Sequence, residues 1–266
     1  MIFSKKAISL LGSAILILFL SACGGGSTDG GSNIELSSSS VGDSGYPLSS
    51  SSLQKNSSSS LDLSSSSIVI IGGTFTDARD NKEYKWVEIG SQTWMAENLN
   101  YVTTIRSWCY DNDESNCAQY GRLYYWATAM NLPDSCVFQK NEKECSSQIQ
   151  TPHQGICPAG WHLPSNVEWT TLLDFTGGSS VAGIKLKSAT GWDGTDDYGF
   201  NALPGGRRFN LGGAFREVRT GGYWWTVTEY GSGTAYYRRM SSEFTFLSKG
   251  DEAKNNGLSV RCVKDN

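Results

Sequence analysis

The sequence is poor in histidine and has no excess of basic charge. Its two histidines, His153 and His162, leave few ligands for zinc and few imidazole bases for catalysis. Charged residues make up 18% of the chain, and 22 Lys and Arg face 26 Asp and Glu, for a formal net charge of −4. Domains that bind nucleic acid carry basic patches or a high isoelectric point. The composition therefore argues against a nucleic-acid partner and rules out most metalloenzymes.

The N-terminal apolar stretch is too short for a transmembrane helix, which needs about 20 residues. It covers residues 7–20 and follows Lys5 and Lys6. A basic segment, a short apolar segment and small residues before a cleavage point are typical of an export signal. The residues LSAC at 20–23 resemble the lipobox of bacterial lipoproteins, whose cysteine is lipidated. We therefore expect residues 1–22 to be removed and Cys23 to carry the lipid, with a soluble secreted protein as the alternative.

Serine blocks dominate the segment that follows, at 37–40, 49–52, 57–60 and 64–67. A segment with so few apolar residues cannot bury enough surface to offset its ordering entropy. We predict a disordered tether over residues 23–67 and one folded head over residues 68–266. Residue 24 is Gly rather than the Asp that retains Gram-negative lipoproteins in the inner membrane. An exported, lipid-anchored protein of the outer membrane or cell surface is therefore expected.

Six cysteines remain once Cys23 is set aside, and an even number in an oxidising compartment indicates disulfides. They allow 15 pairings. Proximity in the sequence favours Cys109–Cys117 and Cys136–Cys145, which leaves Cys157–Cys262 to close a long loop. In the chain-entropy model such a loop stabilises the fold by roughly 4–5 kcal/mol.

The head shows a few helix signals among many strand signals. A hairpin is predicted over residues 84–95 with a two-residue turn at Gly90 and Ser91. Ser165 and Glu168 form a capping-box pattern that begins a helix, which the glycines at 177–178 end. Further helices are predicted over 122–130 and 181–187, and further strands over 209–215, 223–228, 235–240 and 258–263. Together these elements predict an α+β fold of short helices, small antiparallel sheets and long loops, stapled by disulfides.

Several longer motifs in the head resemble a family of exported bacterial proteins. They are DARD at 77–80, WMAENLNY at 94–101, CYDND at 109–113, YGRLY at 120–124, CPAGWHLP at 157–164, GFNALPGG at 199–206 and SVRCV at 259–263. Together they are similar to the Fibrobacter succinogenes major paralogous domain, whose members often follow serine-rich linkers. The resemblance covers residues 74–264. Asn81 departs from the family pattern, which has Gly in the first turn, and Cys136 and Cys145 look like an added pair.

This family is in turn similar to the C-type lectin-like fold, including its formylglycine-generating enzymes. The motif that opens the helix at Ser165 and the late Val260-Arg261-Cys262 strand carry that second resemblance. It implies a C-type lectin-like head. Because a fold does not fix a function, it implies no particular activity.

No catalytic group stands out in the sequence. Bridged cysteines are not nucleophiles, and the enzyme branch's reactive cysteines have no counterpart here. His162 precedes a capped helix and His153 lies in a loop after Pro152, so we expect structural roles for both. A pair of carboxylates for glycoside hydrolysis has no signature in the sequence, because their spacing is spatial. We therefore expect a protein that is not an enzyme.

Two acidic loops are the only candidates for a metal. Oxygen-rich loops suit calcium, but Asp and Asn are also ordinary turn residues. The candidates are Asp111 and Asp113 between the first two cysteines, and Asp193, Asp196 and Asp197. We expect no obligatory cofactor, with calcium as the one ion that these loops could hold.

Aromatic residues are plentiful, with nine Trp and twelve Tyr. In a strand, neighbouring side chains point to opposite faces, so one ring of each adjacent pair should face outward and could stack on a sugar. The candidate ligand contacts are Trp192, Tyr223, Trp224, Trp225, Tyr236 and Tyr237. The expected function is non-catalytic binding or adhesion, with polysaccharide or a surface protein as ligand. The alternatives are an extracellular enzyme acting on glycans or proteins, and a structural envelope component.

Overall fold

The computed structural model describes residues 69–137 and 145–266, which belong to one compact unit. The predicted signal peptide, Cys23 and the predicted tether lie outside these residues. The described part is a mixed α+β fold made mostly of strands, with a few short helices and three disulfides. None of its helices is long and apolar enough to cross a membrane.

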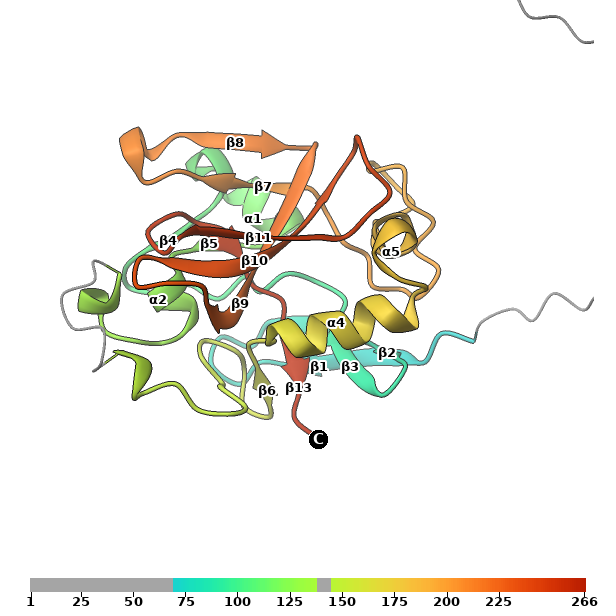
Figure 1. Ribbon diagram of the computed structural model, residues 1–266, viewed down its shortest axis with the longest axis horizontal. Coiled ribbons are helices and arrows are strands. Elements are labelled where there is room, and N and C mark those ends of the chain that lie inside the picture. Colours follow the sequence, from blue (N-terminus) through green and yellow to red (C-terminus); the bar gives the residue numbers. More distant parts are fainter. Residues whose placement is uncertain (1–68, 138–144) are drawn as a thin grey trace, which may run out of the picture. The chain divides into compact units, whose positions relative to one another are not determined.

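Two sheets form the framework (Figure 1). The five-stranded sheet is antiparallel throughout and has the order β1-β2-β3-β13-β6. Its strands are β1 (Gly72–Thr76), β2 (Glu83–Ile89), β3 (Gln92–Met95), β6 (Trp161–His162) and β13 (Val263–Lys264). The last strand of the chain thus lies beside the first hairpin.

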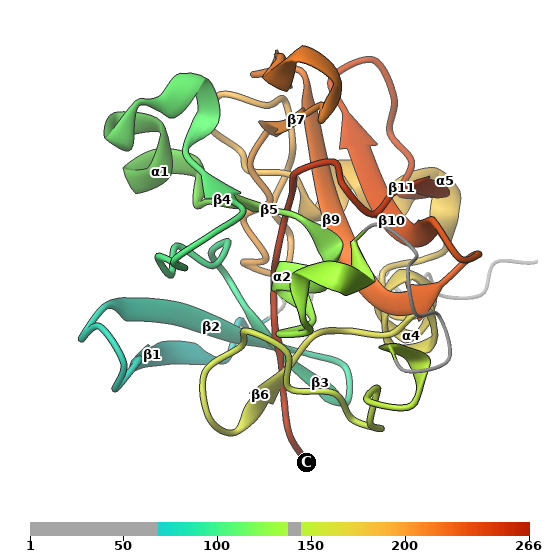
Figure 2. The ribbon, with the colours of Figure 1, turned by 90° about the vertical axis from the view of Figure 1, so that its left-hand side faces the viewer.

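The eight-stranded sheet has the main order β11-β10-β9-β12-β5-β4, with β7 also paired to β9 and β8 to β7. Its strands are β4 (Ser107–Trp108), β5 (Leu123–Tyr124), β7 (Gly205–Arg208), β8 (Phe215–Val218), β9 (Gly221–Glu229), β10 (Thr234–Ser241), β11 (Ser248–Ala253) and β12 (Leu258–Ser259). Figure 2 shows the two sheets one above the other, with the C-terminal segment running down from the upper to the lower.

Four α-helices that lie wholly within the described residues accompany the sheets. They are α1 (Glu114–Tyr120), α2 (Trp126–Ala129), α4 (Asn166–Phe175) and α5 (Ser179–Leu186). Helix α4 lies between the sheets in Figure 1. The ring of its Trp169 packs 4.7 Å from Trp94 of β3 and 6.1 Å from Trp224 of β9. This helix therefore joins the two sheets through aromatic packing.

Several predicted elements are confirmed. Ile89 pairs with Gln92, so the first hairpin has the predicted two-residue turn. Ser165 is the N-cap of α4, and its capping box with Glu168 is complete. The helix predicted over 181–187 is α5, which begins two residues earlier and ends one residue earlier than expected. Asn81, at the family's Gly position, has φ 59°, a left-handed conformation that Asn tolerates better than most residues.

Other predicted elements were wrong. The predicted helix over 122–130 is strand β5 followed by the single turn of α2. The predicted strand over 209–215 is mostly a turn between β7 and β8, because Gly212 and Gly213 adopt positive φ. The closing strand over 258–263 is split into β12 and β13, which belong to different sheets. Helix α1 was not predicted.

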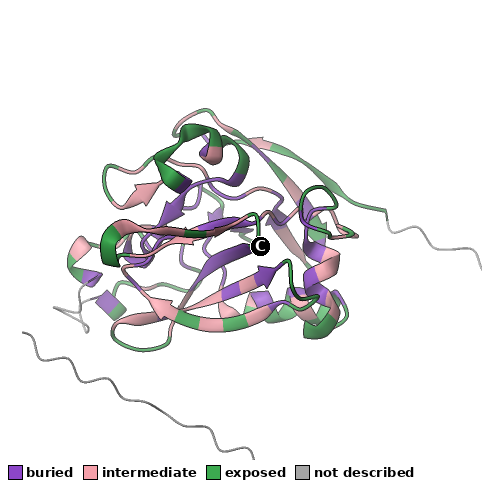
Figure 3. Ribbon diagram, turned by 90° about the horizontal axis from the view of Figure 1, so that it is seen from above, coloured by how far each residue is buried: buried purple, intermediate pink, exposed green. Residues whose placement is uncertain are grey.

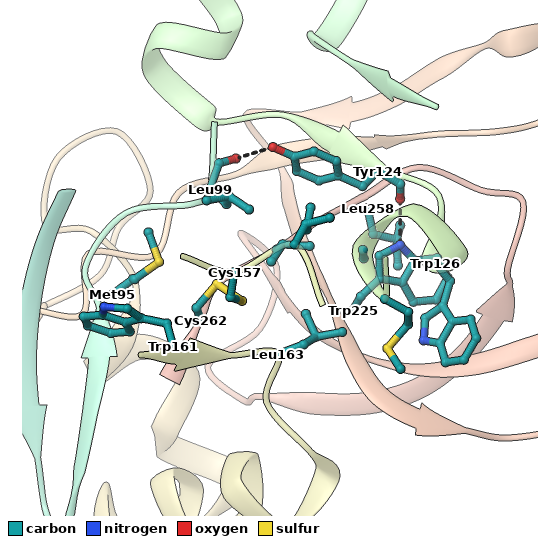
Figure 4. Packing of buried hydrophobic residues seen from close by; sticks show 14 of the residues in the cluster. Met95, Leu99, Tyr124, Trp126, Cys157, Trp161, Leu163, Trp225, Leu258 and Cys262 are labelled. Carbon is teal, nitrogen blue, oxygen red and sulfur yellow. Dashed lines mark hydrogen bonds between the residues drawn. A yellow bond between two sulfur atoms is a disulfide. The ribbon is translucent and has the colours of Figure 1, made fainter. Parts of the chain in front are cut away.

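The core consists of two large clusters and one small one, which Figure 3 shows as the buried interior. In the first, the Cys157–Cys262 disulfide lies among Met95, Leu99 and Trp161 (Figure 4). Two buried polar groups in this cluster are paired: the Tyr124 hydroxyl donates to the Leu99 carbonyl at 3.2 Å, and Trp225 Nε1 donates to the Tyr124 carbonyl at 2.7 Å. Bonds of this kind remove the cost of burying polar atoms.

A buried cation lies in the second part of the core. The fully buried Arg261 guanidinium donates to Asn98 Oδ1 at 2.9 and 3.0 Å, to the carbonyl of Phe200, and to that of Asn201 at 3.3 Å. Burial lowers the Arg261 pKa to about 9, against the opposing charges of Asp196 and Glu97. Arg261 thus fixes the 200–201 loop to the start of the chain's closing segment.

Candidate functional site

A cleft of about 870 Å³ is lined by residues of α4, β6, the end of β9 and the C-terminal segment. Figure 1 shows where these elements lie in the fold. The segment 146–153 forms its remaining wall. The residues that line it are Ser146, Ile149, Gln150, Thr151, Pro152, His153, His162, Leu163, Ser165, Val167, Glu168, Val227, Thr228, Glu229, Asp265 and Asn266.

One wall of the cleft is an imidazole held between two carboxylates. His162 Nδ1 lies 2.7 Å from Asp265 Oδ1, and His162 Nε2 lies 2.5 Å from Glu168 Oε1. Strand pairing places His162 beside Val263, two residues before Asp265. The capping box of α4 places Glu168, whose other oxygen accepts from the Ser165 amide at 2.7 Å and hydroxyl at 2.8 Å. Both the sheet and the helix therefore position this group.

The charges of this wall stabilise one another. Burial lowers the His162 pKa, but hydrogen bonds and charges from Glu168 and Asp265 outweigh it, so the pKa is raised. Burial likewise raises the Glu168 pKa, but bonds from His162 and Ser165 outweigh it and lower the pKa. The imidazolium and the Glu168 carboxylate are thus favoured together.

This wall does not have the arrangement of an acyl-transfer site. A serine nucleophile needs its hydroxyl bonded to an imidazole that acts as base. Here the Ser165 hydroxyl donates to Glu168, and both nitrogens of His162 contact carboxylates. The imidazole therefore has no nitrogen left to accept a proton from a substrate in this conformation.

Glu229 and His153, which also line the cleft, are paired as well. Glu229 contacts the buried Lys254 ammonium and accepts from the Ser146 hydroxyl at 3.0 Å. His153 Nδ1 accepts from the Gln150 amide at 3.1 Å, and His153 Nε2 lies 2.8 Å from the Met130 carbonyl. This pattern fixes His153 as a structural residue that ties the 146–153 segment to α2.

Aliphatic side chains provide the rest of the surface. Leu163 is buried at the base, Val227 and Ile149 are half-buried, and Val167 on the first turn of α4 is 74% exposed. An apolar side chain this exposed at the mouth of an apolar cleft offers contact area to a ligand. No Trp, Tyr or Phe is among the lining residues.

The structure corrects the prediction that one ring of each aromatic pair faces outward. Tyr223, Trp224 and Trp225 of β9 are 1%, 0% and 0% exposed, and Trp192 is 2% exposed. Strand β9 is covered on both faces: Tyr223 and Trp225 belong to the first core cluster, and Trp224 and Trp192 to the second. These four rings are therefore core residues and present no surface to a sugar.

Tyr236 and Tyr237 of β10 are half-buried. The Tyr237 ring packs 5.7 Å from Tyr223, whereas the Tyr236 ring meets Tyr230 edge-on at 5.2 Å. Tyr230, in the turn after β9, is 60% exposed. Tyr236 thus keeps part of its surface accessible, beside the exposed Tyr230, which was not among the predicted contacts.

The acidic loops behave as turn formers. Asp111, Asp193 and Asp196 have φ of 53°, 50° and 48°, in the left-handed region where Asp is enriched. Asp113 caps α1 by accepting from the Ser115 amide at 2.9 Å. Asp196 Oδ1 accepts from the Asn201 amide at 2.7 Å, and burial raises its pKa.

The described residues do not gather these aspartates, Asp197 included, into a group of three or more converging ligands. The group that does converge is Cys109, Glu114 and Cys117, whose ligand atoms lie within 4.8 Å of one another. Its two sulfurs are joined in a disulfide, so they are not available as thiolates.

All three disulfides have the pairing expected from proximity: Cys109–Cys117, Cys136–Cys145 and Cys157–Cys262. The last joins the segment before β6 to the segment before β13, and both strands form the floor beside the cleft. This bond therefore holds His162 and Asp265 in register.

Comparison with known proteins identifies the head. A model of the Fibrobacter succinogenes major domain matches residues 87–264, well over half of the chain. The chain belongs to this family. No curated protein and no solved structure matches it. The Fibrobacter succinogenes major domain thus spans β2 to β13 and includes most of the cleft, with Asp265 directly after the matched residues.

Sequence reasoning missed the cleft and the role of Glu168 and Asp265. Glu168 was recognised only as a capping residue, and nothing marked Asp265, which lies 103 residues from His162. The one available signal was that His162 precedes the capping box by three residues, which places its side chain near Glu168. The partner on β13 becomes visible only once the strands are paired.

Proposed function

We propose that this protein is an exported lipoprotein of the outer membrane or cell surface, anchored through Cys23, with a C-type lectin-like head that binds a ligand without catalysis. The cleft beside α4 is the binding site. The insertion of β13 between the first hairpin and β6, directly after Val260-Arg261-Cys262, supports the lectin-like fold. The 23–67 segment serves as a spacer from the membrane.

This proposal rests on the hydrogen bonds that the polar groups of the cleft make within the protein. Its imidazoles and carboxylates already have partners within the protein, while aliphatic groups provide the accessible surface. An arrangement of this kind favours binding by shape and apolar contact, with a few polar groups fixing orientation.

The ligand that fits best is a polypeptide segment of a surface protein. Sugars bind by stacking on aromatic rings, and the cleft offers none. Aliphatic side chains can instead enter between Val167 and Val227. Glu168 and Asp265 share one imidazolium, so together they keep a net negative charge that favours a Lys or Arg nearby. Polysaccharide is the second candidate, because the exposed Tyr230 beside Tyr236 could stack on a sugar.

The test is to screen the full-length lipidated protein in detergent against peptide and glycan arrays, with and without calcium. The variant Val167→Ser removes apolar surface from the cleft, and Tyr230→Ala removes the exposed ring. We expect peptide binding that Val167→Ser weakens roughly tenfold, since burying a Val side chain is worth about 1.5 kcal/mol or more. Tyr230→Ala should leave this binding unchanged.

Three results would contradict parts of the proposal. Glycan binding that only Tyr230→Ala reduces would move the site to the β9–β10 turn and the ligand to polysaccharide. Loss of binding on chelation would establish calcium as a cofactor of the acidic loops. Chemical change in the ligand recovered after binding, detected by mass spectrometry, would make the protein an enzyme.

A further inference from the structure

Strand β1 forms an unprotected edge of the five-stranded sheet. Among the described residues it pairs with β2 alone, and Gly72, Gly73, Thr74 and Thr76 are all exposed. An edge strand presents a row of unpaired backbone groups, which proteins normally shield with charges, proline, a bulge or a short strand.

The other sheet edges of the described chain are shielded in these ways. Strands β4 and β6 are two residues long. Strand β8 carries Arg216 and Glu217, and β11 carries Lys249, Asp251 and Glu252. By contrast, residues 69–76 contain no charged residue and no proline, and Val69, Ile70 and Ile71 before β1 are 82%, 50% and 54% exposed.

The hydrogen bonds show which backbone groups of β1 face outward. The Ile71 carbonyl accepts from the Glu88 amide, and the Asp77 amide donates to the Lys82 carbonyl, both at 2.8 Å. Odd-numbered residues therefore bond to β2, and alternation directs the amides and carbonyls of Ile70, Gly72 and Thr74 to the free edge. Gly72 and Gly73 place no side chain on either face there.

We propose that this edge pairs with β1 of a second copy of the chain, as an antiparallel strand pair about a two-fold axis. Such an interface is isologous, so the same three residues supply every donor and acceptor on both sides. An uncharged strand can face its own copy without like-charge repulsion. With Gly72 opposite Gly72, Ile70 lies opposite Thr74, and the exposed Val69 lies opposite the half-buried Phe75.

Self-complementarity and charge both favour a second copy of the chain as the partner of this edge. A partner strand with charged residues would find no complementary charge on β1, whereas a second copy brings three more exposed apolar side chains to the same edge. Pairing would join two five-stranded sheets into one continuous sheet and would leave the cleft, which lies at the β6 side, open. This inference does not depend on the proposed ligand.

Hydrogen exchange of the full-length protein in detergent tests the proposal at single residues. Raising the protein concentration should slow exchange of the Gly72 and Thr74 amides at least tenfold. The Gly73 and Phe75 amides, which bond to β2 in every state, should not change. Uniform exchange at all concentrations, or equal slowing of all four amides, would overturn it.

Variants at Thr74 give an independent test by co-isolation of two differently tagged copies from one membrane. Thr74→Pro removes an outward amide, Thr74→Lys adds the charge that protects other edges, and Thr74→Val keeps the amide as a control. Ser248→Lys adds the same charge to the β11 edge. We expect both tags together for wild type, Thr74→Val and Ser248→Lys, and one tag alone for Thr74→Lys and Thr74→Pro.

A melting curve identifies any variant that fails to fold, and Thr74→Lys, whose side chain is exposed, decides the matter if Thr74→Pro unfolds. Pairs that survive Thr74→Lys would overturn the assignment to β1. A different protein recovered in place of the second copy, and lost with Thr74→Lys, would overturn the choice of occupant.

Discussion

Two cations near β13 are held in opposite ways: Arg261 lies just before this strand, and His162 pairs with it. Arg261 is fully buried and donates to neutral oxygens, whereas His162 lies in the cleft wall between two carboxylates. Burial lowers the Arg261 pKa to about 9, while the carboxylates overcome burial and raise the His162 pKa. The core cation thus stays charged at neutral pH and fixes loops, whereas the two carboxylates favour the charged form of the cleft cation. In this fold, the charge that shapes the core and the charge that borders the cleft are separate.

The largest effect should come from the disulfide beside the core cation. Removing it with Cys157→Ala and Cys262→Ala frees a loop of 105 residues, which should cost about 4–5 kcal/mol of unfolding free energy. Removing Cys109–Cys117, whose separation is 8, should cost about 2–3 kcal/mol. Denaturant unfolding of the two double variants measures both values. Equal losses would show that loop entropy does not explain the stabilising effect of the long-range bond.

Replacing the core cation should have the next largest effect. Arg261→Met leaves the carbonyls of Phe200 and Asn201 without this donor, while Asn98 Oδ1 keeps the Trp224 indole at 2.8 Å. Two buried acceptors without partners predict a loss of about 2–4 kcal/mol. Arg261→Lys keeps the charge but has one nitrogen for three acceptors, so the stability of this variant should lie between those of the wild type and Arg261→Met.

Denaturant unfolding of both Arg261 variants checks this order. An Arg261→Met protein as stable as wild type would mean that the cation serves specificity rather than stability, as replaced buried ion pairs sometimes do. The cleft should be unaffected in either case, because His162 contacts neither Arg261 nor its acceptors.

The sequence signals that succeeded are local. The turn at Gly90 and the capping box at Ser165 depend on residues within four positions of one another, so the printed sequence is enough to predict them. The disulfide pairing succeeded because two pairs are close in the chain and only one pairing then remains. The family was recognised from contiguous motifs.

The features that failed are those set by tertiary context. Alternation predicts opposite directions for Trp224 and Trp225, and the structure agrees, but a core cluster covers each face of β9. Nothing near either residue in the sequence reveals this coverage. The cleft was invisible for the same reason, since His162 meets Asp265 only through the pairing of β6 with β13.

The smallest predicted effect is the pH dependence of the cleft cation. A raised pKa in the folded state means that His162 contributes its full stability below its unfolded pKa of about 6.5 and loses it as pH rises through the folded value. Glu168, with a lowered pKa, contributes above about 4.5 and loses its contribution as pH falls. The stability of the wild type should therefore fall as pH rises above 6.5. His162→Gln should remove this pH dependence and lower the free energy of unfolding by about 1–2 kcal/mol near pH 6. This figure allows for the weaker ion pair with Asp265, which is partly exposed to solvent.

Asp265→Asn keeps an acceptor but removes one charge, so it should lessen the pH dependence without removing it. Melting curves between pH 5 and pH 9 test this prediction. The range of about two pH units on either side of neutrality is sufficient, because one group titrates over about two units. A slope that persists in His162→Gln would assign the titration to another group and leave the cleft cation uncharged.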